Sequence, residues 1–563
     1  MGSEGEFRRT HERPQAVSLL RRIGAYVAPV RETYLDALNR FAAEKPDAIF
    51  LDYEGKMVTF EEIDRQSNRL AHGLAAVGIA KGDRVITLID NSDDLVTIFF
   101  AINKLGAIWV PINTAYRGPF LRHQAFDADA AVAICETHYV QQLLDVADDL
   151  PALTDIFVRG ACDERTGKPM LSSLERLRAA NAAAPDIHIA PEDLSALIYT
   201  SGTTGPSKGC MVSHSYLCSI GRQRNRCIVP ESSDITWSCL PLSHIAALGS
   251  LLISNLLAGA RIAIATQFSV SGFWPEIERS GATHAQLMAS MFRLLAHAPD
   301  NETMIRCRGQ LRSVTGVPLS EPDRKIWNER FGVEYMMTFA YGQTEAVMVT
   351  MRPQGSPQPP LTSMGPATEE FEIMVADDEN RPVPIGETGE LCVRPTRPGC
   401  MFSGYWRRPE DSLKAMRDLW WHTGDFVRMD EDGYLFFVDR KKDYLRSRGE
   451  NISSFEVESA LMTHPAIAEA ACFAISAGQG LEEHVKAAIV PVDGAGVSAR
   501  ALFEWARDNL PYFAVPRYIE LMPVLPKTPT GRVQKHELRT LGVTAATWDS
   551  VAENLEIRRP KRK

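Results

Sequence analysis

The sequence predicts an α/β protein with a large N-terminal domain of mostly parallel sheets and helices, followed by a small α+β domain. Over residues 84–339, short apolar runs suited to buried strands alternate with longer runs suited to helices. After about residue 364 the pattern changes to short alternating runs broken by turn residues, and it changes again after residue 441. We therefore expect a large domain at residues 1–441, including a small β-rich subdomain, and a small domain at residues 442–563.

The first strand–helix–strand unit is expected at residues 84–111. An apolar run at residues 84–89 fits a buried strand, and Ser92 then offers a helix N-cap followed by two acidic residues. Residues 95–105 fit a buried helix that Gly106 can end, before a strand at residues 107–111. The same alternation recurs at residues 261–265, 282–297 and 332–339.

The later parts of the chain carry different signals. Short strands of the β-rich subdomain are predicted at residues 371–375, 389–393 and 434–439. In the small domain, Ser453 or Ser454 can cap a helix that reaches residue 462. Strands are then expected at residues 466–475 and 484–492, and a helix at residues 499–510.

Length and charge limit the class of function. The 563 residues exceed one ordinary core and fit roughly three or four packed units. Hydrophobic residues make up 45% and charged residues 23%, as in folded globular proteins. The formal net charge of -10 argues against nucleic acid and anionic membranes as partners. The basic run at residues 558–563 is interpreted as a solvated tail.

Ten cysteines occur without C-x-x-C pairs or Cys/His metal spacing, which is typical of reduced thiols. Residues 1–22 carry both charge signs and resemble neither a signal peptide nor an anchor, so a cytoplasmic location is expected. The longest apolar run, residues 245–260, is too short to span a bilayer and includes polar residues. It predicts a buried helix, and we expect no transmembrane segment.

The sharpest chemical pattern is YTSGTTGPSKG at residues 199–209, which follows an apolar run at residues 194–199. Glycines and hydroxyl side chains after a buried strand supply donors for phosphate oxygens without steric bulk, and Lys208 adds a cation. A flexible linker has a similar composition but does not need the preceding strand. Ser207 occupies the place of the second glycine in G-x-x-x-x-G-K-[ST], which argues against a P-loop NTPase.

This loop resembles the phosphate loop of the adenylate-forming superfamily, which includes acyl-CoA synthetases, peptide-synthetase adenylation domains and firefly-type luciferases. The resemblance implies that Lys208 and Thr200 are catalytic and that Thr200 also helps to hold the metal ion. It further implies that the loop itself binds the phosphates of ATP. The residues concerned are Ser201, Gly202, Thr203, Thr204 and Gly205.

Residues 341–345, YGQTE, resemble the second nucleotide motif of this family. The resemblance implies that Tyr341 lies beside the adenine and that Gly342 and Thr344 belong to the nucleotide site, with Thr344 on a phosphate. It also implies that Glu345 holds Mg²⁺ and is catalytic. Taken alone, the pattern would indicate only a turn with a capping hydroxyl.

Residues 421–425, WHTGD, and the later residues 439–440 resemble the family's ribose-binding pair, Asp425 and Arg440. A carboxylate suits this role because it accepts two hydrogen bonds from a vicinal diol. Residues 440–458 match the junction between the two family domains, which implies a hinge at Lys442 and places Gly449 beside the pantetheine channel. Together these matches cover the chain from about Thr59 to Glu537.

The resemblance implies ATP, Mg²⁺ and coenzyme A as cofactors and a carboxylic acid as the substrate. The carboxylate attacks the α-phosphate of ATP to give an acyl-adenylate, and the thiol of coenzyme A then attacks the acyl carbonyl. Electrostatic stabilisation must offset the approach of two anions in the first step. The resemblance further implies that the small domain reorients about Lys442 between the two steps.

The acid is expected to lie near His244, in LPLSH at residues 240–244, which matches a motif beside the substrate carboxylate. A core histidine is the alternative. Eight residues near family motifs are expected to line the acyl pocket, and all are small or apolar. They are Ala247, Leu248, Met288, Met291, Phe292, Gly316, Val317 and Ala340. This set favours a hydrophobic acid of the aromatic, branched, medium-chain or sterol-side-chain type.

One position departs from the family. Its C-terminal motif usually ends in Thr/Ser-Gly-Lys, whereas PKTPTGR at residues 526–532 ends in arginine. Arg532 keeps the charge but loses the compact geometry of a lysine. Either Arg532 replaces the catalytic lysine, or Lys527 or Lys535 takes part, or adenylation is slow.

The leading hypothesis is an acyl- or aryl-CoA ligase. A stand-alone adenylation enzyme that loads a carrier protein is less favoured, since residues 238–248 hold no acidic residue to bind an α-amine. A catalytically silent acyl or nucleotide sensor is the third hypothesis, because of Arg532. The sequence leaves the oligomeric state open, a homodimer included.

Overall fold

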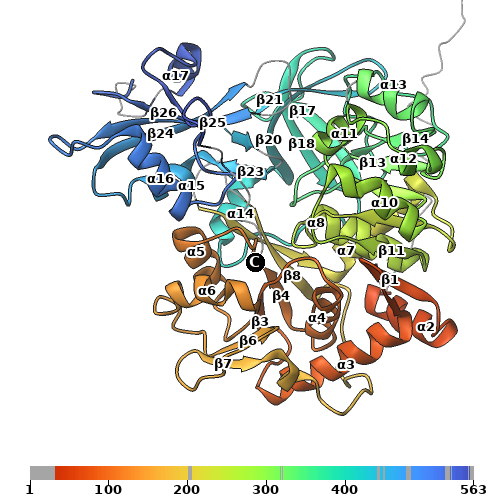
Figure 1. Ribbon diagram of the computed structural model, residues 1–563. Coiled ribbons are helices and arrows are strands. Elements are labelled where there is room, and N and C mark those ends of the chain that lie inside the picture. The colour runs from red at the N-terminus through yellow and green to blue at the C-terminus, as the bar shows by residue number, and fades with distance from the viewer. Residues whose placement is uncertain are drawn as a thin grey trace, which may run out of the picture. The chain divides into compact units, whose positions relative to one another are not determined.

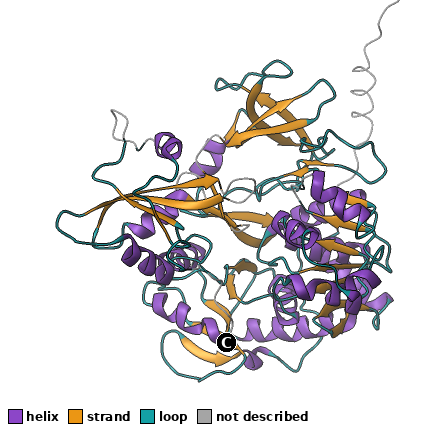
Figure 2. Cartoon of the chain, turned by 45° about the horizontal axis from the view of Figure 1, so that its top comes forward, coloured by secondary structure: helices purple, strands orange, loops and turns teal. Residues whose placement is uncertain are grey.

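The computed structural model describes residues 32–200, 206–316, 319, 321–440, 444–447, 450–476, 483–526, 533, 535–555 and 557. The chain divides into two compact units, Met1–Glu32 and Thr33–Lys563, and the fold given below is that of the second. Figure 2 shows helices packed beside strands throughout the part of the chain that the structure describes.

The first sheet has seven strands in the order β7-β6-β5-β3-β4-β8-β9, parallel except for β9. Its strands are β3 (Arg84–Leu88), β4 (Ile108–Pro111), β5 (Val132–Glu136), β6 (Asp155–Arg159), β7 (Met170–Ser173), β8 (Leu194–Thr200) and β9 (Lys208–Ser213). The predicted strand–helix–strand unit is confirmed, with α4 (Asp93–Lys104) between β3 and β4. The Ser92 side chain caps α4 by accepting a hydrogen bond from the backbone N–H of Leu95 at 3.2 Å.

Helices cover both faces of this sheet (Figure 1). Alternate residues of a strand face opposite ways, and Val85 and Ile86 accordingly belong to different hydrophobic cores. The core of Val85 includes α3 (Phe60–Ala76) and α4, and the core of Ile86 includes α5 (Gly118–Ala128) and α6 (Val140–Ala147). The short 3₁₀ helices η1 (Thr137–Tyr139) and η2 (Leu174–Leu177) follow β5 and β7.

The second sheet has the order β14-β13-β12-β10-β11-β1-β2 and is parallel except for β2. Its strands are β1 (Ile49–Tyr53), β2 (Lys56–Thr59), β10 (Ile235–Ser238), β11 (Arg261–Ile264), β12 (His284–Gln286), β13 (Ser313–Thr315) and β14 (Tyr335–Met337). Its helices are α2 (Tyr34–Glu44), α7 (His214–Ile228), α10 (Val270–Ser280), α11 (Ala289–Ala296), α12 (Glu302–Arg306) and α13 (Glu321–Glu329). The predicted alternation of strands and helices is therefore confirmed here too.

The apolar run at residues 245–260 is helical and mostly buried, as predicted, but it is not one regular α-helix. It forms α8 (Ile245–Ala247), a π-helical segment η3 (Leu248–Ile253) and α9 (Ser254–Ala258). The hydroxyl of Ser254 donates to the Ser250 carbonyl at 2.7 Å, and the Ser250 hydroxyl donates to the carbonyl of Ala246. Such side-chain bonds compete with the regular helical ladder, which explains the local widening.

The β-rich subdomain is an antiparallel sheet in the order β17-β18-β20-β19, with β21 paired to β20. Its strands are β17 (Phe371–Ala376), β18 (Thr388–Pro395), β19 (Met416–Arg417), β20 (Trp420–Met429) and β21 (Leu435–Arg440). The short pair β15 (Ala340–Tyr341) and β16 (Thr350–Met351) precedes it, and α14 (Pro409–Ala415) lies within it.

The C-terminal part begins with the hairpin of β22 (Tyr444–Ser447) and β23 (Glu450–Ser453). A sheet in the order β24-β25-β26-β27 follows, made of β24 (Ile467–Ser476), β25 (Glu483–Pro491), β26 (Tyr518–Leu521) and β27 (Trp548–Asp549). Its helices are α15 (Ser454–Leu461), α16 (Ala499–Asn509) and α17 (Lys535–Leu541). Apart from Phe120, the fully buried apolar residues of its core come from residues 452–538. The boundary placed between residues 441 and 442 lies outside the described residues and stays a prediction.

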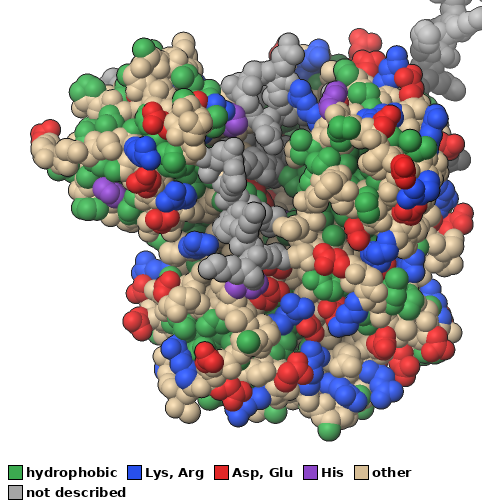
Figure 3. Space-filling view, viewed as in Figure 1, with side chains coloured by type: hydrophobic (Ala, Val, Ile, Leu, Met, Phe, Trp, Pro, Cys, Tyr) green, Lys and Arg blue, Asp and Glu red, His purple; other side chains and the backbone are tan. Residues whose placement is uncertain are grey.

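The distribution of surface charges and the state of the cysteines match what the amino-acid composition predicts. On the face shown in Figure 3, acidic and basic side chains are interspersed. All ten cysteines are free thiols, and nine of them are buried. Among the described residues, no helix is both long enough and apolar enough to cross a membrane.

Candidate active site

The predicted acid site lies where neighbouring parallel strands end. The strands β10, β12, β13 and β14 run in the same direction, so their carboxyl ends meet at one edge of the second sheet. The segments that leave them carry His244, Met288, Gly316 and Ala340, respectively. Ligands of open parallel sheets bind at this edge, outside the carboxyl ends of the strands.

The predicted acyl-pocket residues differ in their surroundings. Ala247 and Leu248 are 1% and 0% exposed, whereas Met288, Met291 and Ala340 are half-buried. Their assignment to a pocket stays a prediction.

Phe292 and Gly316 contribute to core packing. Phe292 is fully buried, and its ring meets the ring of Trp327 edge-on at 4.9 Å between centroids. A Cβ atom at Gly316 would lie 2.3 Å from the Phe292 ring and 2.4 Å from the Leu287 carbonyl oxygen, so only glycine fits there.

His244 contacts the C-terminal part of the chain. Its Nε2 atom lies 3.3 Å from Oε2 of Glu450 in β23, and 47% of its side chain is exposed. The protein atoms around the ring displace part of its water and lower the His244 pKa, but the charge and hydrogen bond of Glu450 outweigh this effect, so the pKa lies above its ordinary value. This exposure is not that of a core histidine. The ion pair joins the segment after β10 to the β22–β23 hairpin.

Glu345 is a buried carboxylate, 8% exposed. The Tyr405 hydroxyl donates a hydrogen bond to its Oε1 atom at 2.7 Å. Burial raises the Glu345 pKa, and the hydrogen bond from Tyr405 and the charge of Lys208 oppose the rise. Lys208 Nζ lies 3.1 Å from Oδ2 of Asp411 and 4.9 Å from the centroid of the Tyr405 ring.

The metal predictions agree with this geometry. Thr200 and Lys208 face each other as cross-strand partners in β8 and β9, at the two ends of the predicted phosphate loop. Carboxylate and hydroxyl oxygens are the hard ligands that Mg²⁺ prefers. Because a buried carboxylate gains stability from a cation, Glu345 suits a magnesium site, and the part of Thr200 in it stays a prediction.

The two predicted nucleotide motifs meet at Asp425. The Tyr341 hydroxyl donates to Asp425 Oδ2 at 2.5 Å, and Gln343 Nε2 donates to the same oxygen at 2.9 Å. Asp425 and Arg440 are cross-strand partners in β20 and β21, and their role as a ribose-binding pair stays a prediction.

A tyrosine of α7, Tyr216, fixes the backbone of the second nucleotide motif. The Tyr216 hydroxyl donates to the Thr344 carbonyl at 3.0 Å and accepts from the Val347 N–H at 2.8 Å. A Cβ atom at Gly342 would lie 2.6 Å from the Met348 nitrogen, so this turn also requires glycine.

Some predicted residues fall outside the part of the chain that the structure describes. They are Ser201, Gly202, Thr203, Thr204, Gly205, Val317, Lys442, Gly449, Lys527 and Arg532. Lys535 is described, and its Nζ atom lies 2.6 Å from both Ser454 Oγ and Glu458 Oε1 within the C-terminal part. The part of Lys535 in adenylation stays a prediction.

Sequence reasoning missed four residues that support this site: Tyr216, Gln343, Tyr405 and Asp411. Gln343 stands inside a motif, and its position beside Thr344 could have identified it. The other three act on residues far away in the sequence, with Tyr405 bonded to a carboxylate 60 positions earlier. Nothing in their local sequence indicates that contact.

Comparison with protein-family models adds an independent observation. The model described as AMP-binding enzyme matches residues 38–406, and the AMP-binding enzyme C-terminal domain model matches residues 456–532. The chain belongs to the AMP-binding enzyme family. The predicted resemblance to adenylate-forming enzymes is thereby confirmed.

Relatives of this AMP-binding enzyme are similar over most of their length. The crotonobetaine/carnitine–CoA ligase of Salmonella typhimurium is 28% identical over 510 residues, which cover 90% of this chain and 98% of the relative. The anthranilate CoA ligase AuaEII, solved with anthranoyl-AMP, has a TM-score of 0.67 and 27% identity over 91% of this chain and 97% of its own. The amide bond synthetase McbA from Marinactinospora thermotolerans has a TM-score of 0.77 and 26% identity, covering 90% and 99%.

These findings establish the general activity. The chain is an AMP-forming ligase of the acyl- or aryl-CoA ligase family, with ATP, Mg²⁺ and coenzyme A as its cofactors.

Proposed function

We propose that this AMP-binding enzyme converts a hydrophobic carboxylic acid into its coenzyme A thioester through an acyl-adenylate. The ion pair between His244 and Glu450 carries this proposal. It joins the predicted carboxylate site to the C-terminal hairpin beside Gly449, the residue expected to border the pantetheine channel. An enzyme whose acid site touches this hairpin is suited to receive a thiol there.

In the first step, the chain must bring a carboxylate to the α-phosphate of ATP. Bound Mg²⁺ would neutralise phosphate charge. Glu345 would hold that cation, and Lys208, now paired with Asp411, would exchange this partner for a phosphate oxygen. Asp425 would hold the ribose in the position set by Tyr341 and Gln343. Most of the catalytic effect would come from positioning and electrostatics.

In the second step, the thiol must reach the acyl carbonyl as AMP leaves. The raised pKa of His244 favours an imidazolium beside the acid site. Because Glu450 raises this pKa, the charge develops when the C-terminal hairpin lies against the acid site. The pairing of His244 with Glu450 would satisfy the same charge once the hairpin has arrived for thioester formation.

The proposed acid class rests on the apolar side chains after the strand ends. Ala247, Leu248, Met288, Met291 and Ala340 carry no charge and are buried or half-buried. An acid with a second charge would lose hydration without gaining a partner among these residues. We therefore propose an aromatic, branched, medium-chain or sterol-side-chain acid.

The ten free thiols support a reducing compartment such as the cytoplasm.

Three other outcomes are distinguished by the product. Transfer to an amine would resemble the chemistry named for McbA. Transfer to a carrier protein would give a protein-bound thioester. Tight binding of acid or nucleotide without turnover would indicate a sensor.

The experiment is a screen of the four acid types with ATP, Mg²⁺ and coenzyme A, with AMP and thioester measured by mass spectrometry. Amines and a phosphopantetheinylated carrier protein replace coenzyme A in parallel reactions. We expect equal amounts of AMP and acyl-CoA from at least one hydrophobic acid. AMP formation with an amine or carrier product, and little acyl-CoA, would contradict the proposal.

The role of the ion pair is tested by Glu450→Gln, with Glu537→Gln as the control because Glu537 is an exposed carboxylate in the same part of the chain. Glu450→Gln should slow thioester formation from a supplied acyl-adenylate and leave ATP–pyrophosphate exchange near wild type. Glu537→Gln should change neither reaction. Equal slowing of both half-reactions by Glu450→Gln would count against the hairpin's role in thiol transfer.

A further inference from the structure

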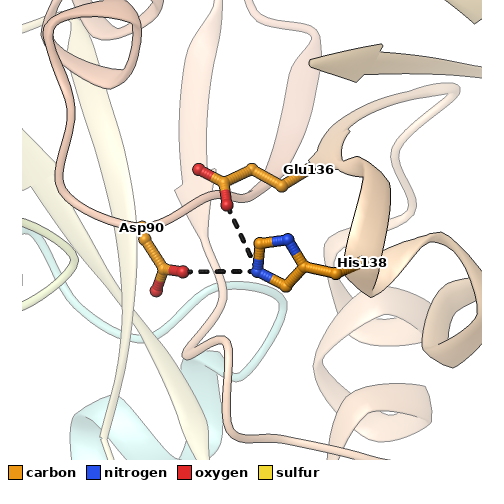
Figure 4. Close-up of side chains that lie close together, drawn as sticks. All are labelled: Asp90, Glu136 and His138. Carbon is orange, nitrogen blue, oxygen red and sulfur yellow. Dashed lines mark ion pairs between the residues drawn. The ribbon is translucent and has the colours of Figure 1, made fainter. Parts of the chain in front are cut away.

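Three metal-ligand side chains converge at the carboxyl edge of the first sheet, on elements that the proposed mechanism does not use (Figure 4). Asp90 follows β3, Glu136 is the last residue of β5, and His138 lies in η1 directly after it. Strands β3 and β5 are parallel neighbours, with Leu88 opposite Cys135 in the register. The sheet therefore brings the three side chains together, and they point toward one another in Figure 4.

The separations suit one metal ion. His138 Nε2 lies 3.6 Å from Asp90 Oδ2 and 3.3 Å from Glu136 Oε2, and the three ligand atoms all lie within 4.8 Å of one another. Tetrahedral ligands about 2.1 Å from a zinc ion are about 3.4 Å apart. Two of the three separations are close to this value, and the third, between Asp90 and Glu136, is no more than 4.8 Å.

Neighbouring groups orient the two carboxylates. The Tyr139 hydroxyl donates to Asp90 Oδ2 at 2.7 Å, and the Thr114 hydroxyl donates to Asp90 Oδ1 at 2.9 Å. Arg159 donates to Glu136 Oε1 at 3.0 Å, which turns Oε2 toward His138. Hydrogen bonds of this kind fix metal ligands in place and are a regular part of metal centres.

The burial pattern leaves an entry path. The side chains of Asp90 and Glu136 are 5% and 9% exposed, whereas that of His138 is 33% exposed. Asp90 supplies negative charge, Glu136 shares its charge with Arg159, and the imidazole at their open side leaves a route from solvent. The mixed nitrogen and oxygen ligands favour zinc over Mg²⁺ and Ca²⁺, which prefer oxygen alone.

We propose that Asp90, Glu136 and His138 bind a divalent cation of the zinc class, at a site separate from that of Glu345. Water would fill the remaining coordination position on the exposed side of His138. The site shares no residue with those assigned to ATP, Mg²⁺ or coenzyme A.

The position of the site gives the ion a structural role. Asn91, next to Asp90, accepts a hydrogen bond from the Leu242 N–H at 3.0 Å and donates to the Leu240 carbonyl at 2.9 Å. Leu240 and Leu242 belong to the segment that carries His244. A bound ion would brace this connection between the two sheets.

The test uses the full-length protein, stripped of metal by a chelator and titrated with Zn²⁺ against a chromophoric competitor. Co²⁺ serves as a second probe, because its visible spectrum reports tetrahedral geometry and thiolate ligands. The Cys162→Ser background removes the one cysteine that is not buried.

The variants are His138→Gln, Tyr139→Phe, which removes the hydroxyl bonded to Asp90, and His297→Gln as a matched control. His297 Nε2 lies 3.1 Å from a single carboxylate, that of Asp323, so it is a histidine–carboxylate pair without a second acid. His138→Gln removes a partly exposed side chain, and the thermal unfolding of each metal-free variant shows whether it is folded.

We expect about one Zn²⁺ per chain, a higher unfolding temperature with Zn²⁺, and a Co²⁺ spectrum without thiolate bands. His138→Gln should weaken binding by at least ~10-fold and Tyr139→Phe by ~10- to 100-fold, while His297→Gln should bind as wild type does. Unchanged affinity in folded His138→Gln, thiolate bands with Co²⁺, or no saturable binding would overturn the proposal and leave an ordinary ion pair.

Discussion

Replacement of Tyr405 by phenylalanine tests how the chain keeps Glu345 ionised. The Tyr405 hydroxyl is bonded to Glu345 Oε1 at 2.7 Å, and the two residues are 9% and 8% exposed, so water replaces the lost bond poorly. A hydrogen bond to a charged group contributes about 1.5–3 kcal/mol. Its loss should destabilise the carboxylate by a similar amount and so raise the Glu345 pKa further.

The direction of the effect on adenylation follows from the need for Glu345 to be ionised. Burial already raises the Glu345 pKa, and the Tyr405 hydroxyl stabilises the carboxylate that we propose as the Mg²⁺ ligand. Without that hydroxyl, the carboxylate becomes protonated at a higher pH. Adenylation by Tyr405→Phe should therefore resemble wild type at alkaline pH, and on the acid side it should decline at a higher pH than wild type does.

The assay is ATP–pyrophosphate exchange at saturating Mg²⁺ as a function of pH. Tyr335→Phe is the matched control, because the Tyr335 hydroxyl donates to the Arg352 carbonyl at 2.7 Å and is not bonded to Glu345. The control should lose activity on the acid side of the profile, its acid limb, at the same pH as wild type. An unshifted acid limb in folded Tyr405→Phe would refute the reasoning.

Four further substitutions follow from the same account. Glu345→Gln should abolish pyrophosphate exchange and leave the circular dichroism spectrum intact, since it removes a metal-binding charge and little volume; wild-type exchange would refute the metal role. Arg532→Ala should lower adenylation by ~10² to 10³-fold while thioester formation from a supplied acyl-adenylate survives; normal adenylation would transfer the role to another residue. Lys442→Pro should preserve adenylation and impair thioester formation, because a fixed φ restricts the domain motion; equal loss in both half-reactions would argue against a hinge there. Burial raises the Asp234 pKa, but hydrogen bonds from the Glu231 N–H and Arg312 lower it more, to about 2. This folded-state value lies below the unfolded one of about 3.9, so the stabilisation is present at neutral pH and is lost as pH falls toward 2. Asp234→Asn should accordingly cost about 2 kcal/mol in urea unfolding at pH 7, and a cost that stays constant down to pH 2 would contradict this assignment.

Local signals in the sequence predicted much of the fold. The helix α4 was predictable because its cap, Ser92, and its apolar run are adjacent in the chain. The β-rich subdomain was predictable because its strands are short and separated by turn residues. The π-helical segment at Leu248–Ile253 was not, because it depends on which carbonyl each serine hydroxyl selects in the folded chain.

The residues of the candidate site likewise fall into those that the sequence could identify and those that it could not. Tyr341, Thr344, Glu345 and Asp425 lie in short motifs that resemble a family, so the sequence alone could name them. Tyr405 could not be named, because only the fold brings it to Glu345. The three proposed zinc ligands were also beyond sequence reasoning, since Asp90 meets Glu136 and His138 only through the pairing of β3 with β5.

The most direct test of the account follows oxygen from the acid. The first acid that turns over in the screen is labelled with ¹⁸O in both carboxylate oxygens and converted with ATP, Mg²⁺ and coenzyme A. Attack of the carboxylate on the α-phosphate predicts that one ¹⁸O atom appears in AMP and the other stays in the thioester carbonyl. Unlabelled AMP, label in pyrophosphate, or no AMP from any acid in the screen would contradict an acyl-adenylate mechanism for this chain.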